Sequence, residues 1–266
     1  MEKNVLLTIE YDGTRFHGWQ KQPGVRTVQG LLEEMLAVVC KTEIRLNGVS
    51  RTDAGVHALA HRASFAGEFG IPVERLKIAV NNLLSGRTSA VSKNADVRIL
   101  DARRVPDSFH ARFDARGKLY RYIIDNNRDM SVFNRNYRYH VARPLDLDKM
   151  REAASFVVGT HDFKCFQASG QEPDVDTVKT VYSLEVFEEP AGEGLISLEV
   201  SGDGFLYNMV RIITGTLVEI GLGRKKPEDM KQIIEGRDRR AAGHTAPPQG
   251  LYLAEVHYDE RSFLDE

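Results

Sequence analysis

The order of apolar and polar positions in the first half of the chain predicts alternating strands and helices. Residues 4–10 are β-rich and end at the turn signal Tyr11-Asp12-Gly13. From Thr27 onward, apolar residues recur at the three- and four-residue spacing of a helix. Further along, the pattern predicts strands over 62–67 and 97–105, a helix over 73–84, and polar loops over 47–55 and 85–96.

The second half mixes helices and strands in a similar way. Its predicted strands cover 118–124, 181–187, 195–200 and 251–257, and its predicted helices cover 147–158, 206–220 and 227–235. Several strands follow one another without a helix between them, which favours an α+β fold with a largely antiparallel sheet over a doubly wound fold. The order of elements begins to repeat near Pro106. We therefore expect two similar halves, 1–106 and 107–266.

The net charge of the chain does not indicate what the protein binds, so we consider where the charges lie along the sequence. The 36 Lys and Arg residues nearly balance the 38 Asp and Glu residues, and the formal charge of -2 argues neither for nor against a polyanion. Short basic runs occur at 224–226 and 237–240. Such runs are typical of solvated helix ends, with RNA contact as the alternative.

Length and composition indicate an intracellular globular protein. The chain of 266 residues is 42% hydrophobic, enough to bury a sizeable core. Cys40 and Cys165 are far apart and neither belongs to a CxxC motif, which excludes a disulfide framework and indicates a reducing compartment. No apolar run reaches the about 20 residues of a membrane span, and the N-terminal run is too short for a signal peptide. We expect a cytoplasmic protein.

The densest chemical signal is the loop 48–58, GVSRTDAGVHA. It crowds a carboxylate, a guanidinium, two hydroxyls, an imidazole and two glycines into a stretch without helix or strand periodicity. Function concentrates on such loops, and an aspartate beside an arginine stays ionised, ready for nucleophilic attack or base catalysis. Asp53 is the candidate and Arg51 its neighbour. The alternative is that Asp53 caps a helix while Arg51 is solvated, and composition alone favours that alternative.

A second signal is Arg211, which lies within the apolar run FLYNMVRIITG. A helix that is apolar almost all round is buried, and a buried guanidinium needs a partner. Asp53 is one possible partner. The alternatives are a structural acid such as Glu219, or a side chain that extends outward to solvent. Spacing leaves these possibilities open.

Cationic and aromatic residues interleave between 109 and 122. The stretch FHAR ends at Arg112, and Arg116, Lys118, Tyr120, Arg121 and Tyr122 follow. This mixture suits RNA, because unpaired bases stack on aromatic rings and phosphates contact Lys and Arg. In a strand, Tyr120 and Tyr122 lie on one face and Arg121 on the other. The alternative is that the tyrosines pack in the core.

These motifs together resemble the bacterial TruA-type tRNA pseudouridine synthases. The resemblance rests on SRTDAGVHA, FHAR followed by LYRYII, GFLYNMVRIITG, the closing GLYL and the opening IEYDGTRFHGWQ with TVQG. The motifs occur in the family's order over almost the whole chain. One connection departs from the pattern: residues 84–97 are longer than the family's usual turn, which leaves their contacts with tRNA open.

The resemblance implies a set of roles. Asp53 matches the catalytic aspartate that forms a covalent adduct, Tyr120 the tyrosine that stacks on the target uracil, and Arg211 the arginine paired with that aspartate. Arg51 matches an arginine linked to base flipping, and we expect Arg112 to bind substrate. The family fold has two α+β halves that share an antiparallel sheet, with the active-site cleft between them. Its members are homodimers that act on uridines 38, 39 and 40 of tRNA.

The implied reaction needs no ATP, redox cofactor or metal, because bonds break and form within one bound substrate. The uridine must leave the base stack, at a cost of about a few kcal/mol. Asp53 then attacks the ring or the ribose, or assists loss of the base; the released uracil rotates, and C5 bonds where N1 had been. A closed cleft keeps water from the intermediate.

Two other functions fit parts of the sequence. In a metal-dependent hydrolase, Asp53, His57 and His61 would lie on one face of a helix as a metal triad, although Gly55 in their midst argues against the helix. In a non-catalytic RNA-binding protein, the cations would matter and Asp53 would not. The presence of Asp53, Tyr120 and Arg211 together argues against this second alternative.

Overall fold

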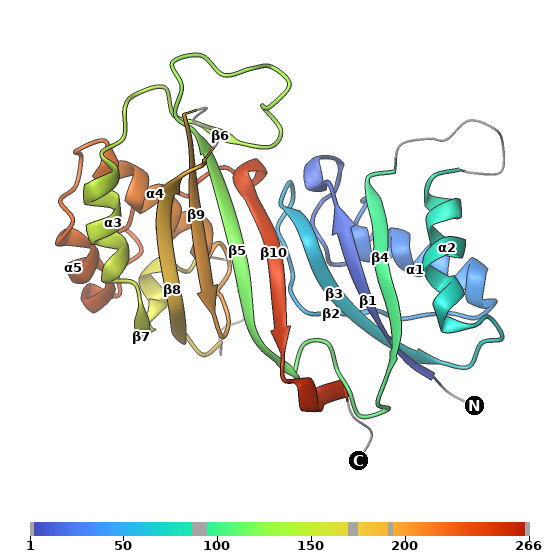
Figure 1. The fold of residues 1–266 in the computed structure, drawn as a ribbon. Helices are drawn as coiled ribbons and strands as arrows, with labels where there is room; N and C mark the ends of the chain where they lie inside the picture. Colours follow the sequence, from blue (N-terminus) through green and yellow to red (C-terminus); the bar gives the residue numbers. More distant parts are fainter. Residues whose placement is uncertain (1–2, 87–94, 170–174, 191–193, 264–266) are drawn as a thin grey trace. The chain divides into compact units, whose positions relative to one another are not determined.

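The computed structural model describes residues 3–86, 95–169, 175–190 and 194–263 (Figure 1). By its contacts the chain separates into two compact units, one of Met1–Arg116 with Leu253–Glu266 and one of Gly117–Tyr252. Both divisions fall inside strands, β5 (Ala115–Asp125) and β10 (Leu251–Tyr258). These packing units differ from the halves expected from sequence, because the C-terminal residues return to the first unit. The division near Pro106 stays a prediction.

The sheet of the first unit is built around β1 (Lys3–Tyr11), whose residues are almost all buried. β1 pairs antiparallel with β3 (His57–Gly67) on one side and with β4 (Val97–Val105) on the other, so that Leu6 lies opposite both Ser64 and Arg103. The short β2 (Asn47–Gly48) pairs with β3, and β10 follows β3 in the strand order. Because β1 is paired on both sides and buried, its sequence is a continuous apolar run.

Two helices accompany this sheet, α1 (Val28–Cys40) and α2 (Val73–Leu84), which contact each other (Figure 1). The Thr27 hydroxyl caps α1 by accepting a hydrogen bond from the Gly30 amide at 3.3 Å. Leu32 and Leu36, one turn apart, are buried. The helix ends at Cys40, and the next residue, Lys41, has a left-handed backbone. Capping and periodicity therefore explain why the sequence predicts this helix correctly.

The second unit carries an antiparallel sheet in the order β5, β9, β8, β7. These strands are β9 (Leu195–Gly202), β8 (Val178–Glu188) and β7 (Gly159–Asp162), and the short β6 (Tyr139–His140) pairs with β5 in parallel. The helices α3 (Leu147–Ser155), α4 (Met209–Gly221) and α5 (Asp229–Gly236) gather beside β8 (Figure 1). Antiparallel strands with helices confirm the α+β class.

Several boundaries differ from the sequence predictions. β3 begins at His57 rather than at residue 62, because buried histidines continue the strand through a stretch that reads as polar. α4 begins at Met209 rather than at residue 206, because Asn208 adopts a left-handed backbone (φ 61°) that precedes the helix. The short strands β2, β6 and β7 were not predicted. Most of the connection over 85–96 lies outside the described residues, which omit 87–94.

Two further expectations concern membrane spans and disulfide bonds. Among the described residues, no helix is long and apolar enough to cross a membrane. Cys40 and Cys165 are both buried thiols without a disulfide bond, and burial raises the pKa of each, that of Cys165 to about 12.

Candidate active site

In the first unit, backbone hydrogen bonds hold the loop that carries Asp53. The Trp19 amide donates to the Thr52 carbonyl at 3.0 Å, and the Val56 amide donates to the Asp53 carbonyl at 3.2 Å. Gly55 has a positive φ of 79°, which glycine adopts without strain. Asp53 is partly buried and Arg51 is exposed. The backbone of the loop is therefore fixed, while Arg51 extends into solvent.

Side chains and glycines of the segment 11–19 complete this support. The hydroxyl oxygens of Tyr11 and Thr52 lie 2.6 Å apart, and both residues are buried. A Cβ on Gly18 would lie 2.6 Å from the Thr52 carbonyl oxygen, and one on Gly13 would lie 2.0 Å from the Val56 carbonyl oxygen. Only glycine permits such close contact between two backbone segments. The opening YDGTRFHGW motif is thus the support of the Asp53 loop.

The two histidines after the loop have packing contacts of their own. His57 Nδ1 accepts from the Gly13 amide at 3.0 Å. The His61 ring stacks on Trp19 with ring centroids 3.7 Å apart, and its Nε2 donates to the Ser50 carbonyl at 3.0 Å. Both histidines are buried and lie on β3. The helix that the metal-triad alternative requires is therefore not formed. Among the described residues, no three His, Cys, Asp or Glu side chains are grouped to hold a metal ion.

Arg112 lies on an exposed turn of the first unit. Its guanidinium is 5.9 Å from the centroid of the Phe113 ring, which is 76% exposed, and the His110 ring is 4.3 Å from Phe113. The turn is anchored from below, because Ala111 is fully buried and its amide donates to Ser64 Oγ at 3.0 Å. Arg112 is therefore an exposed cation on an anchored turn, and its role as a substrate-binding residue stays a prediction.

In the second unit, both tyrosines of β5 are buried, as the core-packing alternative requires. Tyr120 packs edge-on against Phe205, with ring centroids 5.2 Å apart. The Tyr122 hydroxyl donates to the Pro247 carbonyl at 2.7 Å, and burial raises the pKa of Tyr122 well above its usual range. Arg121 points to the other face, where its Nε donates to Glu199 at 2.7 Å. The Tyr120 ring is thus buried against Phe205, and its stacking on a uracil stays a prediction.

Arg211 lies on α4, where every residue other than Arg211 and Glu219 is buried. The prediction of a helix that is apolar almost all round is confirmed, but Arg211 itself is only partly buried. Its Nε donates to the Ala246 carbonyl at 2.7 Å, and an Nη donates to Asn208 Oδ1 at 2.5 Å. Glu219, considered as a structural partner, is instead held by His244 and Lys225. The pairing of Arg211 with Asp53 stays a prediction.

The site residues are thus divided between the units. Arg51, Asp53 and Arg112 belong to the first unit, and Tyr120 and Arg211 belong to the second. Sequence reasoning missed the segment that follows α5, whose Ala246 carbonyl binds Arg211. The consecutive prolines Pro247 and Pro248 could have indicated its extended backbone, because a residue before proline avoids the helical conformation.

Comparison with known proteins points in one direction. The sequence profile of the tRNA pseudouridine synthase family matches residues 7–114 and 153–259. Among similar curated proteins, tRNA pseudouridine synthase A of Thermoanaerobacter sp. (strain X514) is 44% identical over 96% of this chain and 100% of its own. tRNA pseudouridine synthase A 2 of Clostridium tetani is 46% identical over 97% and 100%, and tRNA pseudouridine synthase A of Bacillus pumilus is 45% identical over 96% and 99%.

Proposed function

We infer the function of this chain from one premise: it belongs to the tRNA pseudouridine synthases. It is an isomerase that converts uridine in tRNA to pseudouridine. We propose that the uridines it modifies are those at positions 38, 39 and 40 of the anticodon stem-loop, as the resemblance of this chain's motifs to the TruA type implies.

We propose that Asp53 is the nucleophile. In the reaction the bond between ribose C1′ and uracil N1 breaks and a bond between C1′ and C5 forms. The proton leaves C5, and N1 takes up a proton. An ionised carboxylate can attack the ring or the ribose and leave again unchanged, so the enzyme is regenerated without a co-reactant. The observation that carries this proposal is the backbone support of the loop at Thr52 and Val56, which holds Asp53 in one geometry.

The other candidate residues receive roles that match their surroundings. Tyr120 stacks on the flipped uracil, and Arg211 pairs with Asp53. Exposed Arg51 and Arg112 contact the RNA backbone, Arg51 during flipping of the base. Because a uridine within the tRNA is stacked on its neighbours, flipping the target base out requires such contacts to hold the flanking strand.

We further propose that the enzyme works as a homodimer on tRNA in the cytoplasm, without a metal or organic cofactor. The reaction is internally balanced, because all bonds that change lie within the bound nucleotide. Water must stay out of the site while the base is detached, since it would hydrolyse the intermediate.

One experiment tests the finer target. tRNA from cells that lack this protein is mapped for pseudouridine and compared with tRNA from cells that carry it. We expect loss of pseudouridine at one or more of positions 38, 39 and 40, and its return when purified protein is added. Loss confined to other positions would contradict the proposed target. A protein that binds tRNA but restores no pseudouridine would be the non-catalytic RNA-binding alternative.

A further inference from the structure

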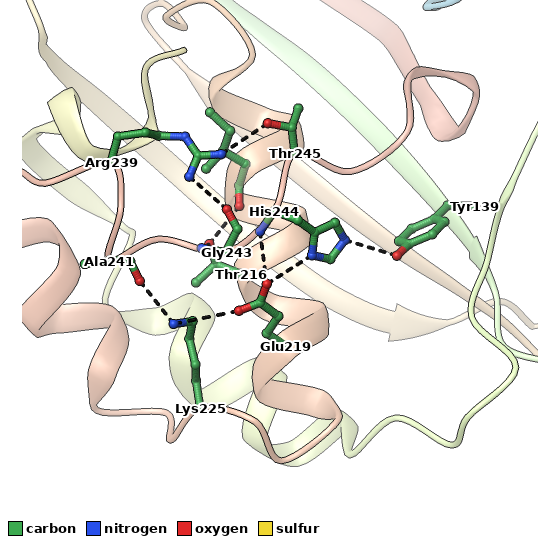
Figure 2. A network of polar contacts seen from close by, with 10 residues as sticks. Tyr139, Thr216, Glu219, Lys225, Arg239, Ala241, Gly243, His244 and Thr245 are labelled. Atoms are coloured by element: carbon green, nitrogen blue, oxygen red, sulfur yellow. Dashed lines mark hydrogen bonds and ion pairs between the residues drawn. The ribbon is translucent and has the colours of Figure 1, made fainter. Parts of the chain in front are cut away.

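A segment without regular secondary structure, residues 243–247, lies against α4 in the second unit, and we call it the strap; Figure 2 shows its first three residues. Its backbone touches the helix directly. A Cβ on Gly215 would lie 1.8 Å from the His244 carbonyl oxygen, and a Cβ on Gly243 would lie 2.7 Å from Thr216 Cα. Two glycines, one on each element, therefore permit this contact, which larger residues would prevent.

The first end of the strap is anchored to α4 by two side chains. The Gly243 amide donates to Thr216 Oγ1 at 2.8 Å, and this hydroxyl donates to the Ile212 carbonyl at 2.8 Å. One turn further along, Glu219 Oε1 accepts from the His244 amide at 3.0 Å and from His244 Nδ1 at 3.1 Å (Figure 2). Each anchor uses a main-chain amide of the strap, so the anchors fix the backbone itself.

Glu219 is suited to this task because it is held in the charged form. Burial alone would raise the pKa of its carboxyl, but the hydrogen bonds from His244 and the positive charge of Lys225 outweigh burial and lower the pKa. Lys225 Nζ lies 3.7 Å from the second carboxylate oxygen. His244 Nδ1 donates to Glu219, and its Nε2 lies 3.1 Å from the Tyr139 hydroxyl. Arg239 adds a bond to the Gly243 carbonyl at 2.9 Å.

The other end of the strap meets the candidate site residues. The Ala246 carbonyl accepts from Arg211 Nε at 2.7 Å, and the Ala246 amide donates to the Arg211 carbonyl at 3.0 Å. The next carbonyl, that of Pro247, accepts from the Tyr122 hydroxyl at 2.7 Å. Tyr122 lies two residues after Tyr120 on β5. The strap thus connects the strand that carries Tyr120 with the helix that carries Arg211.

We propose that the strap sets the orientation of the Arg211 guanidinium before tRNA binds, with Thr216 and Glu219 as positioning residues that act through it. An arginine side chain has many rotamers, and fixing Nε against a main-chain carbonyl removes most of them. Reacting groups held in advance lower the barrier, and a displacement of about 1 Å can cost about 100-fold in rate. This inference rests on the proposed role of Arg211, and it deepens that role.

Two threonines of α4 offer a matched pair of variants. Thr214 and Thr216 are both buried, and each hydroxyl donates to the carbonyl four residues earlier, at 2.9 and 2.8 Å. Thr216 also accepts from the strap, through the Gly243 amide. Replacing either with valine keeps the shape and removes the hydroxyl, so a difference between Thr216→Val and Thr214→Val reports on the strap.

The experiment measures single-turnover pseudouridine formation, tRNA affinity and the Arg211 Nε–H signal in the NMR spectrum of ¹⁵N-arginine-labelled enzyme. Arg211→Lys assigns the signal, because the signal disappears in that variant. We expect Thr216→Val to shift or broaden the signal and to lower the rate by about 10- to 100-fold, with tRNA affinity within about 2-fold of the wild type. Thr214→Val should match the wild type in all three measurements.

Glu219 gives a second test that does not depend on whether Thr216→Val folds. Glu219→Ala removes both bonds to His244, whereas Glu219→Gln keeps an oxygen that can accept them. We expect the alanine variant to behave like Thr216→Val and the glutamine variant to recover most of the rate and the signal. An unchanged Arg211 signal in both Thr216→Val and Glu219→Ala would overturn the inference. If the wild type forms no pseudouridine, the proposed function fails, and the NMR signal still decides whether the strap orients Arg211.

Discussion

Tyr11 and Thr52 join their hydroxyl groups at 2.6 Å and thereby tie β1 to the residue that precedes Asp53. Tyr11 is the last residue of a strand paired on both sides, so its position is fixed by the sheet. The neighbouring Trp19 amide holds the Thr52 carbonyl. A strand that is paired on both sides therefore positions the backbone beside the candidate nucleophile.

The first prediction tests this relationship. Tyr11→Phe removes the hydrogen bond and should destabilise the protein by about 0.5–1.5 kcal/mol, the usual net contribution of such a bond. Turnover should fall more than stability alone explains, because the loop loses its anchor. Thr52→Val should have a similar effect, and urea unfolding of both variants and the double variant measures the coupling. Additive losses in stability would show that the two hydroxyls do not depend on each other.

The second prediction separates stacking from proton transfer at Tyr120. The ring contact with a base is worth about 1–3 kcal/mol by truncation, and the hydroxyl could take part in moving the proton from C5. Tyr120→Phe keeps the ring and should bind tRNA normally yet fail to release product, whereas Tyr120→Leu should also bind poorly. Single-turnover rates and filter-binding affinities decide between the roles. A phenylalanine variant with the full single-turnover rate would leave Tyr120 only a stacking role.

The third prediction concerns Arg211 and Asp53. Arg211→Ala removes bonds to Ala246 and Asn208 and should cost about 1–3 kcal/mol in stability, because a main-chain carbonyl loses a charged donor. If Arg211 acts on Asp53, the double variant Asp53→Ala/Arg211→Ala should lose less, in both stability and activity, than the two single losses combined. Chemical denaturation measures the first quantity and single-turnover kinetics the second. Strict additivity in both would contradict the pairing.

The fourth prediction follows from the lowered pKa of Glu219. In the unfolded chain a glutamate has a pKa of about 4.3. A group whose folded pKa is lower stabilises the protein above the unfolded value, and this contribution is lost as pH falls through the folded pKa. The wild type should therefore lose more stability than Glu219→Gln as pH decreases below about 5. Urea unfolding from pH 7 to pH 3 measures both, and parallel curves would show that Glu219 does not contribute.

The sequence predicts the long elements because each has a local cause. α1 has a capping Thr27 and apolar residues at helical spacing, and β1 is a continuous apolar run. The short β2 and β6 hold two residues each, too few for any periodicity, and exist because β3 and β5 offer them a partner. Long-range pairing decides such strands, and it leaves no pattern in their own residues.

In the candidate site, too, some features could be predicted from the sequence and others could not. Asp53 and Arg211 lie in motifs whose residue types are specific enough to identify a family. The supports of these residues are less visible, because the Ala246 carbonyl and the Thr52 carbonyl are backbone groups that every residue possesses. Apolar neighbours left open whether the Arg211 side chain is buried or extends outward, and in the structure Arg211 and Glu219 are the two residues of α4 that are only partly buried.

The central claim is that Asp53 is the nucleophile, and one measurement tests it most directly. Asp53→Asn keeps the shape of the side chain but removes its nucleophilic charge. The assay follows tritium release from C5 of uridine in tRNA under single-turnover conditions. The control is Asp176→Asn, an equivalent change at an exposed residue of the second unit. We predict that Asp53→Asn folds, binds tRNA with nearly wild-type affinity and releases no tritium above background, while the control releases it at the wild-type rate. Tritium release by purified Asp53→Asn well above background would contradict the account.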